Sequence, residues 1–187
     1  MSRFLVLFVL IGGVAVWSQT QTKPESSSAS AYARFGFSYK APFGWVDRTS
    51  QMQSDSGDST SQVLLAAFER PPEVTSDSVN SAVIIAAEST ASYPGLKVAA
   101  DYFGPLTELT TSKGFTVVNQ PYLFTMGTRQ LPRADYKKPR GQLTMYQSSL
   151  AMLSKGCVVS FTFIGGSEEE VERLIETLKF MPAKASR

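Results

Sequence analysis

Hydrophobic and polar residues alternate in the first patterned stretch of the chain, RFGFSYKAPFGWVDR at residues 34–48. Every second residue from Phe35 to Tyr39 is aromatic, which predicts a strand with one aromatic face. A Pro-Phe-Gly-Trp turn then breaks the alternation and adds two more large aromatic residues. We expect Phe43 and Trp45 to fold over the end of the sheet and close the core; the alternative is a ligand-stacking surface.

Two short apolar runs, at residues 63–68 and 82–87, follow a polar stretch at 49–61 that is typical of a solvated loop. Continuous apolar runs of this length indicate strands that are covered on both faces. The connection between them is rich in proline, serine and aspartate, which favour turns. We therefore predict two antiparallel central strands.

Residues 94–114 carry apolar residues at helical spacing, and Gly114 is placed to end the helix. Pro105 lies inside this pattern, where proline removes a backbone hydrogen bond, so we expect a kink or two short helices. Pro132 should confine its strand to an edge or an irregular segment. Apolar stretches joined by links with glycine or proline predict four further strands, at 115–126, 128–136, 142–153 and 157–164.

The clearest helix comes last. Ser167 and Glu170 have the spacing of a capping box, and three consecutive glutamates complement the positive end of the helix dipole. The glycine pair before Ser167 could hold an anion on free backbone amides, but the glutamates would repel it, which favours ordinary capping. Helical spacing predicts a buried stripe at Val171, Leu174, Ile175 and Leu178.

Three strands, a helix, four strands and a helix, in that order, predict an α+β fold. We expect an antiparallel sheet of about six to seven strands packed against two main helices. With 187 residues, 43% of them hydrophobic, the chain is long enough for a domain with its own core. We place this single domain at residues 32–181, followed by a short tail at 182–187.

The N-terminus has the organisation of a targeting segment. A single arginine precedes an apolar run that ends at Trp17 and is shorter than the roughly 20 residues of a spanning helix. Cleavage is expected between Ser18 and Gln19. We predict a signal peptide at 1–18, a flexible polar linker at 19–31, and a secreted or periplasmic protein with a soluble mature domain. An uncleaved signal would instead anchor the chain in the membrane.

The amino-acid composition excludes several kinds of catalytic and metal-binding site. The chain has no histidine and one cysteine, Cys157, which excludes histidine-based zinc sites, Ser-His-Asp and Cys-His catalysis, and an internal disulfide. The net charge of +2 gives no reason to expect a nucleic-acid partner. Phosphate-loop, dinucleotide and nucleophile-elbow motifs are missing. We expect no catalytic, cofactor-binding or metal-binding residues, and an inert Cys157 on the apolar face of its strand.

A cluster of basic residues is the best candidate for a binding surface. On an edge hairpin these residues would meet an acidic protein or an anionic component of the cell envelope. Alternatively, the charges and a proline protect a sheet edge against unwanted pairing. The cluster consists of Arg129, Arg133, Lys137, Lys138 and Arg140.

The order of these features resembles the PsbP-like α/β/α sandwich group, which includes photosystem II extrinsic proteins, a Ran-binding nuclear import factor and LpqN-type mycobacterial envelope proteins. The resemblance rests on the aromatic strand leading into Pro-Phe-Gly-Trp, the helix ending in glycine, and the apolar strand followed by a Ser-capped acidic helix and Leu-Lys-Phe. It covers residues 32–181. It implies a mostly non-enzymatic group with many exported proteins that bind other proteins, and no functional residue carries over.

Together these observations predict an exported, non-enzymatic interaction module without a cofactor. We expect it to bind an envelope protein or an anionic envelope component through a sheet edge and its basic hairpin. The alternative is a carrier of a small apolar ligand that is held between the sheet and the helices.

Overall fold

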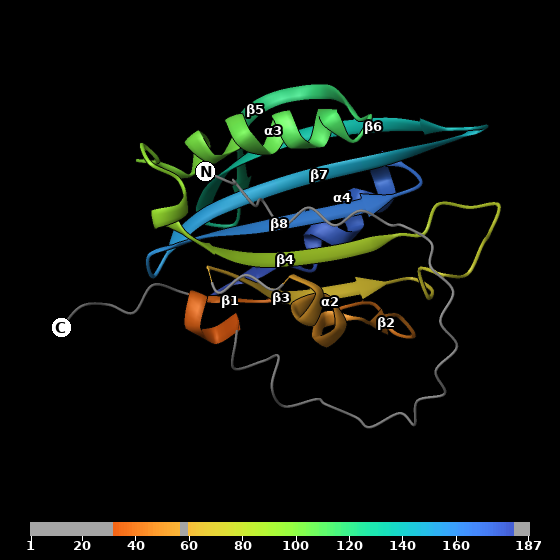
Figure 1. Cartoon of the computed structure of the whole chain (residues 1–187), viewed down its shortest axis with the longest axis horizontal. Coiled ribbons are helices and arrows are strands. Elements are labelled where there is room, and N and C mark those ends of the chain that lie inside the picture. Colours follow the sequence, from red (N-terminus) through yellow and green to blue (C-terminus); the bar gives the residue numbers. More distant parts are fainter. Residues whose placement is uncertain (1–31, 57–59, 182–187) are drawn as a thin grey trace.

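The structure, a computed structural model, describes residues 32–56 and 60–181. The predicted signal peptide at 1–18, the linker at 19–31 and the tail at 182–187 lie outside the described residues. Within them the chain forms one large antiparallel sheet, a small two-stranded sheet and several helices (Figure 1).

Seven antiparallel strands make up the main sheet, in the spatial order β2-β3-β4-β8-β7-β6-β5. This confirms the predicted α+β fold, the two strands after residue 60 and the four successive strands in the second half. Along the chain the strands are β2 (Val46–Asp47), β3 (Ser61–Phe68), β4 (Ala82–Ser89), β5 (Thr116–Met126), β6 (Arg129–Arg140), β7 (Leu143–Ser154) and β8 (Cys157–Gly165).

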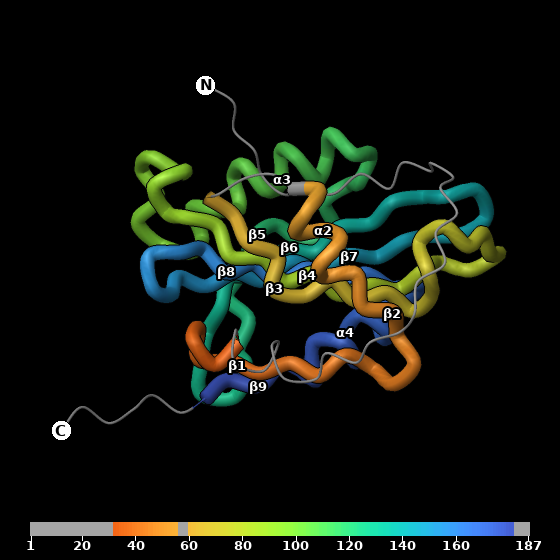
Figure 2. Tube along the Cα trace, turned by 60° about the horizontal axis from the view of Figure 1, so that its bottom comes forward, coloured from red at the N-terminus to blue at the C-terminus, as the bar shows by residue number. Residues whose placement is uncertain are grey.

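Layers of helix cover both faces of the main sheet. Helix α4 (Glu168–Glu176) and the small sheet lie on one face, while α2 (Thr49–Ser56) and α3 (Phe103–Ser112) lie on the other (Figures 1 and 2). Strand alternation produces this sandwich, because neighbouring residues point to opposite faces. In β8, Phe161 belongs to the core cluster beneath α4, whereas Val158 packs with α3.

The first predicted strand does not join the main sheet. Its aromatic alternation is confirmed, since Phe35, Phe37 and Tyr39 are all buried. However, only β1 (Phe37–Ser38) is a strand, and it pairs with β9 (Lys179–Phe180) near the end of the described chain. Alternation along a strand reports which side chains are buried but not which distant strand supplies the pairing partner.

The prediction that Phe43 closes the core is wrong, because this side chain is fully exposed at 106%. The backbone N–H of Trp45 donates to the carbonyl of Pro42 at 3.3 Å, and Gly44 has a φ of +84°, so the chain makes a tight turn here. This turn directs Phe43 into solvent. Trp45 turns back, is partly buried and packs against the core cluster, as predicted.

The polar stretch predicted as a loop at 49–61 begins with helix α2. The carboxylate of Asp47 accepts a hydrogen bond from the backbone N–H of Thr49 at 2.8 Å, which satisfies one of the free donors at the helix start. Met52 is buried against Val63 and Phe68 of β3. A single apolar residue gives no helical period, which is why the sequence pattern did not reveal this helix.

Pro105 in α3 and Pro132 in β6 both lie where a missing backbone N–H does little harm. A 3-10 turn, η2 (Ala99–Tyr102), precedes α3, as expected for an interrupted helix, and Pro105 falls in the first turn of α3. Pro132 was expected on an edge strand or in an irregular segment; β6 is an inner strand and β5 is the edge. Pairing between β6 and β7 begins only at Arg133, so Pro132 pairs with β5 alone.

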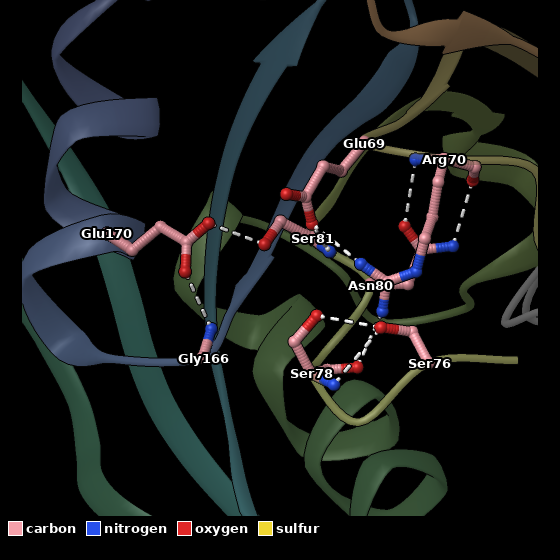
Figure 3. Close-up of polar contacts among 8 residues, drawn as sticks. All are labelled: Glu69, Arg70, Ser76, Ser78, Asn80, Ser81, Gly166 and Glu170. Atoms are coloured by element: carbon pink, nitrogen blue, oxygen red, sulfur yellow. Dashed lines mark hydrogen bonds and ion pairs between the residues drawn. The ribbon is translucent and has the colours of Figure 1, made fainter.

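The start of α4 is tied to the end of the β3–β4 connection (Figure 3). Ser167 Oγ accepts a hydrogen bond from the Glu170 N–H at 3.2 Å, which confirms the predicted N-cap. The Glu170 carboxylate accepts one from the Gly166 N–H at 2.8 Å and one from the Ser81 hydroxyl at 2.5 Å. The backbone amide considered for an anion is therefore used by the protein's own glutamate.

The β3–β4 connection is closed by a reciprocal pair of hydrogen bonds between Arg70 and Asn80 (Figure 3). The Arg70 N–H donates to Asn80 Oδ1 at 3.1 Å, and Asn80 Nδ2 donates to the Arg70 carbonyl at 2.9 Å. The Arg70 guanidinium also donates to the Ser78 carbonyl at 2.5 Å. These contacts hold Ser81 where it reaches Glu170.

We expect Glu170→Ala to lower the free energy of unfolding by about 1–3 kcal/mol, because it leaves the Gly166 amide and the Ser81 hydroxyl without their acceptor. Urea denaturation would measure this loss. Glu169→Ala is the matched control, since Glu169 lies in the same helical turn but is exposed. Equal losses in the two variants would contradict the role given to Glu170.

Candidate functional site

The five basic residues predicted as a binding surface do not form one patch. All five lie on β6, but strand alternation places Arg129, Arg133 and Lys137 on the face of α4, and Lys138 and Arg140 on the face of α3. They also differ in burial: Lys137 and Arg140 are exposed, whereas Arg133 is only 5% exposed.

Arg133 is the centre of a buried polar network rather than a surface charge. Its Nε donates to Asp135 at 2.8 Å, and both of its terminal nitrogens donate to the Glu172 carboxylate of α4, one of them at 3.1 Å. The Ser148 hydroxyl on β7 accepts a further bond at 3.0 Å. The guanidinium also lies over the ring of Phe124, 4.7 Å from its centroid. A buried charge is tolerated only with such partners.

The Asp135 carboxylate connects the network to the edge strand. Asn119 and Tyr122 of β5 each donate to Oδ2 at 3.0 Å, and Ser148 donates to Oδ1 at 2.5 Å. Burial tends to raise the pKa of Asp135, but the hydrogen bonds from Ser148, Arg133 and Asn119 outweigh it, and the pKa is lowered. The network therefore joins β5, β6, β7 and α4.

Tyr122 belongs to the same network and has a raised pKa. Burial and the nearby Asp135 charge raise its pKa to about 12, although Arg133 acts in the opposite direction. A small cavity of about 130 Å³ lies beside these groups and is also lined by Glu168 and Glu172. Because three carboxylates surround one guanidinium, this cavity does not favour an anionic ligand.

The other basic residues have separate roles. The Arg129 guanidinium stacks on the ring of Phe180, 5.0 Å from its centroid, at the opposite end of β6 from Lys138. Lys138 donates to the carbonyl of Lys113 at 2.7 Å, just after α3 ends. Lys137, Lys138 and Arg140 all lie at the end of β6 beside the start of β5, where Lys137 pairs with Thr116, although Lys137 faces α4 and the other two face α3.

Strand β5 is a long open edge of the main sheet. It spans 11 residues, TVVNQPYLFTM, has β6 as its one neighbour and carries no charged side chain. Val118, Tyr122 and Leu123 are exposed, Leu123 by 66%. Pairing with β6 is continuous from Tyr122 to Met126 and irregular around Pro121. The charges expected to protect the edge lie one strand further in.

A groove of about 660 Å³ opens at the other end of the β5–β6 hairpin, beside β7 and β9. Pairing between β6 and β7 ends at Arg133 and Leu150, whereas β7 and β8 remain paired as far as Ser154 and Cys157. The tip of the hairpin therefore leaves β7 and reaches the small sheet (Figure 2). The groove has the size of a ligand site.

Glu88 is a buried carboxylate that the sequence analysis did not single out. It accepts hydrogen bonds from the hydroxyls of Tyr93 and Tyr102, the latter at 2.6 Å. Burial, followed by the charge of Glu88, raises the pKa of Tyr102 well above its ordinary value. These bonds attach η2 and the short turn η1 (Thr90–Ser92) to β4. Glu88, Tyr93 and Tyr102 have irregular spacing in the sequence, so no periodic pattern predicts that they meet.

The sequence carries a clearer signal for the Arg133 network than for Glu88, because Arg133 and Asp135 stand two apart and share one face of a strand. Glu172, by contrast, comes from a helix 39 residues away in sequence and could not be paired with them by spacing.

Cys157 packs against the apolar cluster beneath α4, on the face that was predicted.

Two further properties of the described residues concern metals and membranes. Across residues 32–56 and 60–181, no group of three or more His, Cys, Asp and Glu residues is arranged to hold a metal ion. In the same part of the chain, no helix has the length and apolar character needed to span a bilayer.

No family model matches the chain, and neither does any curated protein. Solved structures do match. Cyanobacterial PsbP from Synechocystis is 13% identical, with a TM-score of 0.49 over 91% of this chain and 96% of that one. Mycobacterium tuberculosis LpqN, involved in cell envelope biogenesis, is 11% identical, with a TM-score of 0.39 over 78% and 83%. A Bacteroides thetaiotaomicron protein is 14% identical, with a TM-score of 0.41 over 81% and 47%.

The two kinds of protein that the sequence resemblance named, PsbP and LpqN, are thus both among the solved structures to which this chain is similar. At these identities and TM-scores the similarity concerns the fold alone. It assigns no site residue, partner or activity.

We expect Arg133→Met to lower the free energy of unfolding by about 3 kcal/mol, because it leaves the half-buried Asp135 carboxylate without its cation. Lys137→Met, on the same strand face but exposed, should change it by less than about 0.5 kcal/mol. Urea denaturation of both variants would test this. A fully stable Arg133→Met protein would show that the network contributes no net stability.

The network should also contribute to acid sensitivity. Because the pKa of Asp135 is lowered in the folded protein, the stabilisation is present above the ordinary value of about 3.9 and is lost as the pH falls through the lowered value. Asp135→Asn should therefore lose stability relative to the wild type at neutral pH, and the difference should shrink in acid. A difference that stays constant between about pH 6 and pH 2.5 would contradict this.

Proposed function

We propose that the protein is an exported, non-enzymatic interaction module that binds an extended segment of a partner protein by strand addition at β5. The observation that carries this proposal is the open edge of β5, which is long, uncharged and exposed. In strand addition, the unpaired N–H and C=O groups of an edge supply affinity, and alternate side chains supply specificity.

Natural sheets usually blunt their edges with charges, prolines, bulges or very short strands. The other edge of this sheet, β2, is only two residues long and follows that rule. In β5 the irregular pairing near Pro121 interrupts the strand, but the stretch from Tyr122 to Met126 stays regular and has no charge. This stretch is where we place the added strand.

The remaining basic residues lie near one end of β5 and would favour one orientation of the partner segment. Lys137, Lys138 and Arg140 lie next to the Thr116 end of β5, and none of them forms an ion pair within residues 32–56 and 60–181. A partner with acidic residues near that end would be attracted to them. Arg133 does not take part, because Asp135 and Glu172 neutralise it.

Export is the second element of the proposal and rests on the N-terminal sequence. The basic start, the apolar run and the small residues before Gln19 support a signal peptide at 1–18. A partner in the cell envelope, or an anionic envelope component, is in keeping with that location. A start at Gln19 in protein recovered from the envelope fraction would test it.

We expect a Val118→Lys, Leu123→Lys variant to lose partner binding by about tenfold or more, because charges on an edge oppose strand pairing. Mild cross-linking in the envelope fraction followed by native mass spectrometry would measure the bound fraction. Hydrogen exchange of the complex should show slowed amides within Thr116–Met126.

Val74→Lys is the matched control, since Val74 is 50% exposed and lies in the β3–β4 connection, away from β5. This variant should keep the partner. Normal binding by the doubly substituted β5 variant, or slowed exchange confined to other segments, would contradict strand addition at this edge.

A further inference from the structure

We propose that the groove between the β5–β6 hairpin tip, β7 and β9 binds a small amphipathic anion: an aliphatic carboxylate whose chain lies on the apolar lining and whose carboxylate meets Arg129. This site is separate from the β5 edge and does not depend on strand addition there.

The groove exists because β6 and β7 separate. Their pairing ends at Arg133 and Leu150, and the hairpin tip turns toward β9, where the Arg129 guanidinium donates to the Met181 carbonyl at 3.5 Å (Figure 2). Beyond Leu150, the last residues of β7 thus pair with β8 alone. Residues of β6, β7 and β9 supply most of the lining of this groove, which has a volume of about 660 Å³.

The lining combines eight apolar residues with three polar ones. Its three polar residues, Thr128, Arg129 and Gln130, are consecutive and lie at the hairpin tip. A ligand that matches this composition has one polar group and an apolar body. The apolar lining consists of Ala99, Leu131, Pro132, Ala151, Met152, Leu153, Phe180 and Met181.

Two of these apolar side chains are unusually open to water: Leu153 is 40% exposed and Met181 is 41% exposed. An aliphatic chain that covers either of them would remove apolar surface from water, which favours binding. The apolar lining alone would accept many ligands, so the charged residue at the polar end decides the class.

Arg129 supplies a positive charge that the described part of the chain does not neutralise. Arg133, on the same strand, forms ion pairs with two carboxylates, whereas Arg129 forms none within residues 32–56 and 60–181. Its guanidinium is positioned by the Phe180 ring and makes one long hydrogen bond to the Met181 carbonyl.

A guanidinium has five N–H donors and binds a carboxylate through two parallel bonds. Because stacking on Phe180 already restricts the Arg129 side chain, less rotamer freedom is lost when a carboxylate binds. A carboxylate therefore fits this end of the groove better than a neutral or cationic group does.

Equilibrium dialysis of the purified protein against labelled dodecanoate and dodecan-1-ol, below the concentrations at which they self-associate, tests the proposal. The two probes share a chain and differ in the charged group. Dodecanoate should bind at least about tenfold more tightly, the ratio expected for a charge-assisted hydrogen bond. Absence of dodecanoate binding, or equal affinity for the two probes, would overturn the proposal.

Substitutions locate the site. Arg129→Gln should remove the preference for dodecanoate while leaving dodecan-1-ol binding unchanged, and Arg129→Lys, which keeps the charge and guards against a structural effect, should keep part of the preference. Arg140→Gln, at the other end of β6, is the matched control and should change neither affinity. An equal effect of Arg140→Gln and Arg129→Gln would mean non-specific attraction and would overturn the site.

Leu123→Lys separates this site from the β5 edge. Leu123 does not line the groove, so this variant should bind dodecanoate as the wild type does. A parallel loss of dodecanoate binding in Leu123→Lys would place the ligand at the edge and contradict the groove.

Discussion

A guanidinium buried as deeply as that of Arg133 must be neutralised where it lies, and this constraint determines how the second half of the sheet is assembled. Its partners come from separate elements: Asp135 from its own strand, Ser148 from β7 and Glu172 from α4. Asp135 in turn accepts hydrogen bonds from β5. The edge strand, two inner strands and the last helix are thus joined at one point, and removing Arg133 would leave the Asp135 carboxylate without its cation.

The two candidate binding surfaces lie on either side of this point. Beyond Arg133, the β5–β6 hairpin is no longer paired with β7, which opens the groove next to β9. Along the outer side of the same hairpin, β5 presents main-chain groups without a neighbouring strand. The edge offers hydrogen bonds to an extended chain, while the groove offers apolar surface and one unneutralised arginine. The surfaces therefore suit different ligands although one hairpin builds both.

The basic residues of β6 show where reading the sequence worked and where it did not. Their strand was predicted correctly, and the shared face of Arg133 and Asp135 follows from alternation alone. A charged residue is exposed in most proteins, however, and the buried acceptor that makes Arg133 an exception comes from distant α4. In the same way, phenylalanine is usually a core residue, but the tight turn that contains Phe43 directs its side chain into solvent.

Local patterns in the chain were enough to predict the strands between residues 61 and 165, the capped last helix and the apolar stripe of that helix, because these follow from backbone periodicity and from contacts between near neighbours. The tertiary structure alone decided that β1 pairs with β9, that β5 rather than β6 is the edge, and that Arg133 is internal. Each of these depends on residues far apart in sequence meeting in space, and alternation with a period of two is the same whichever strand lies alongside.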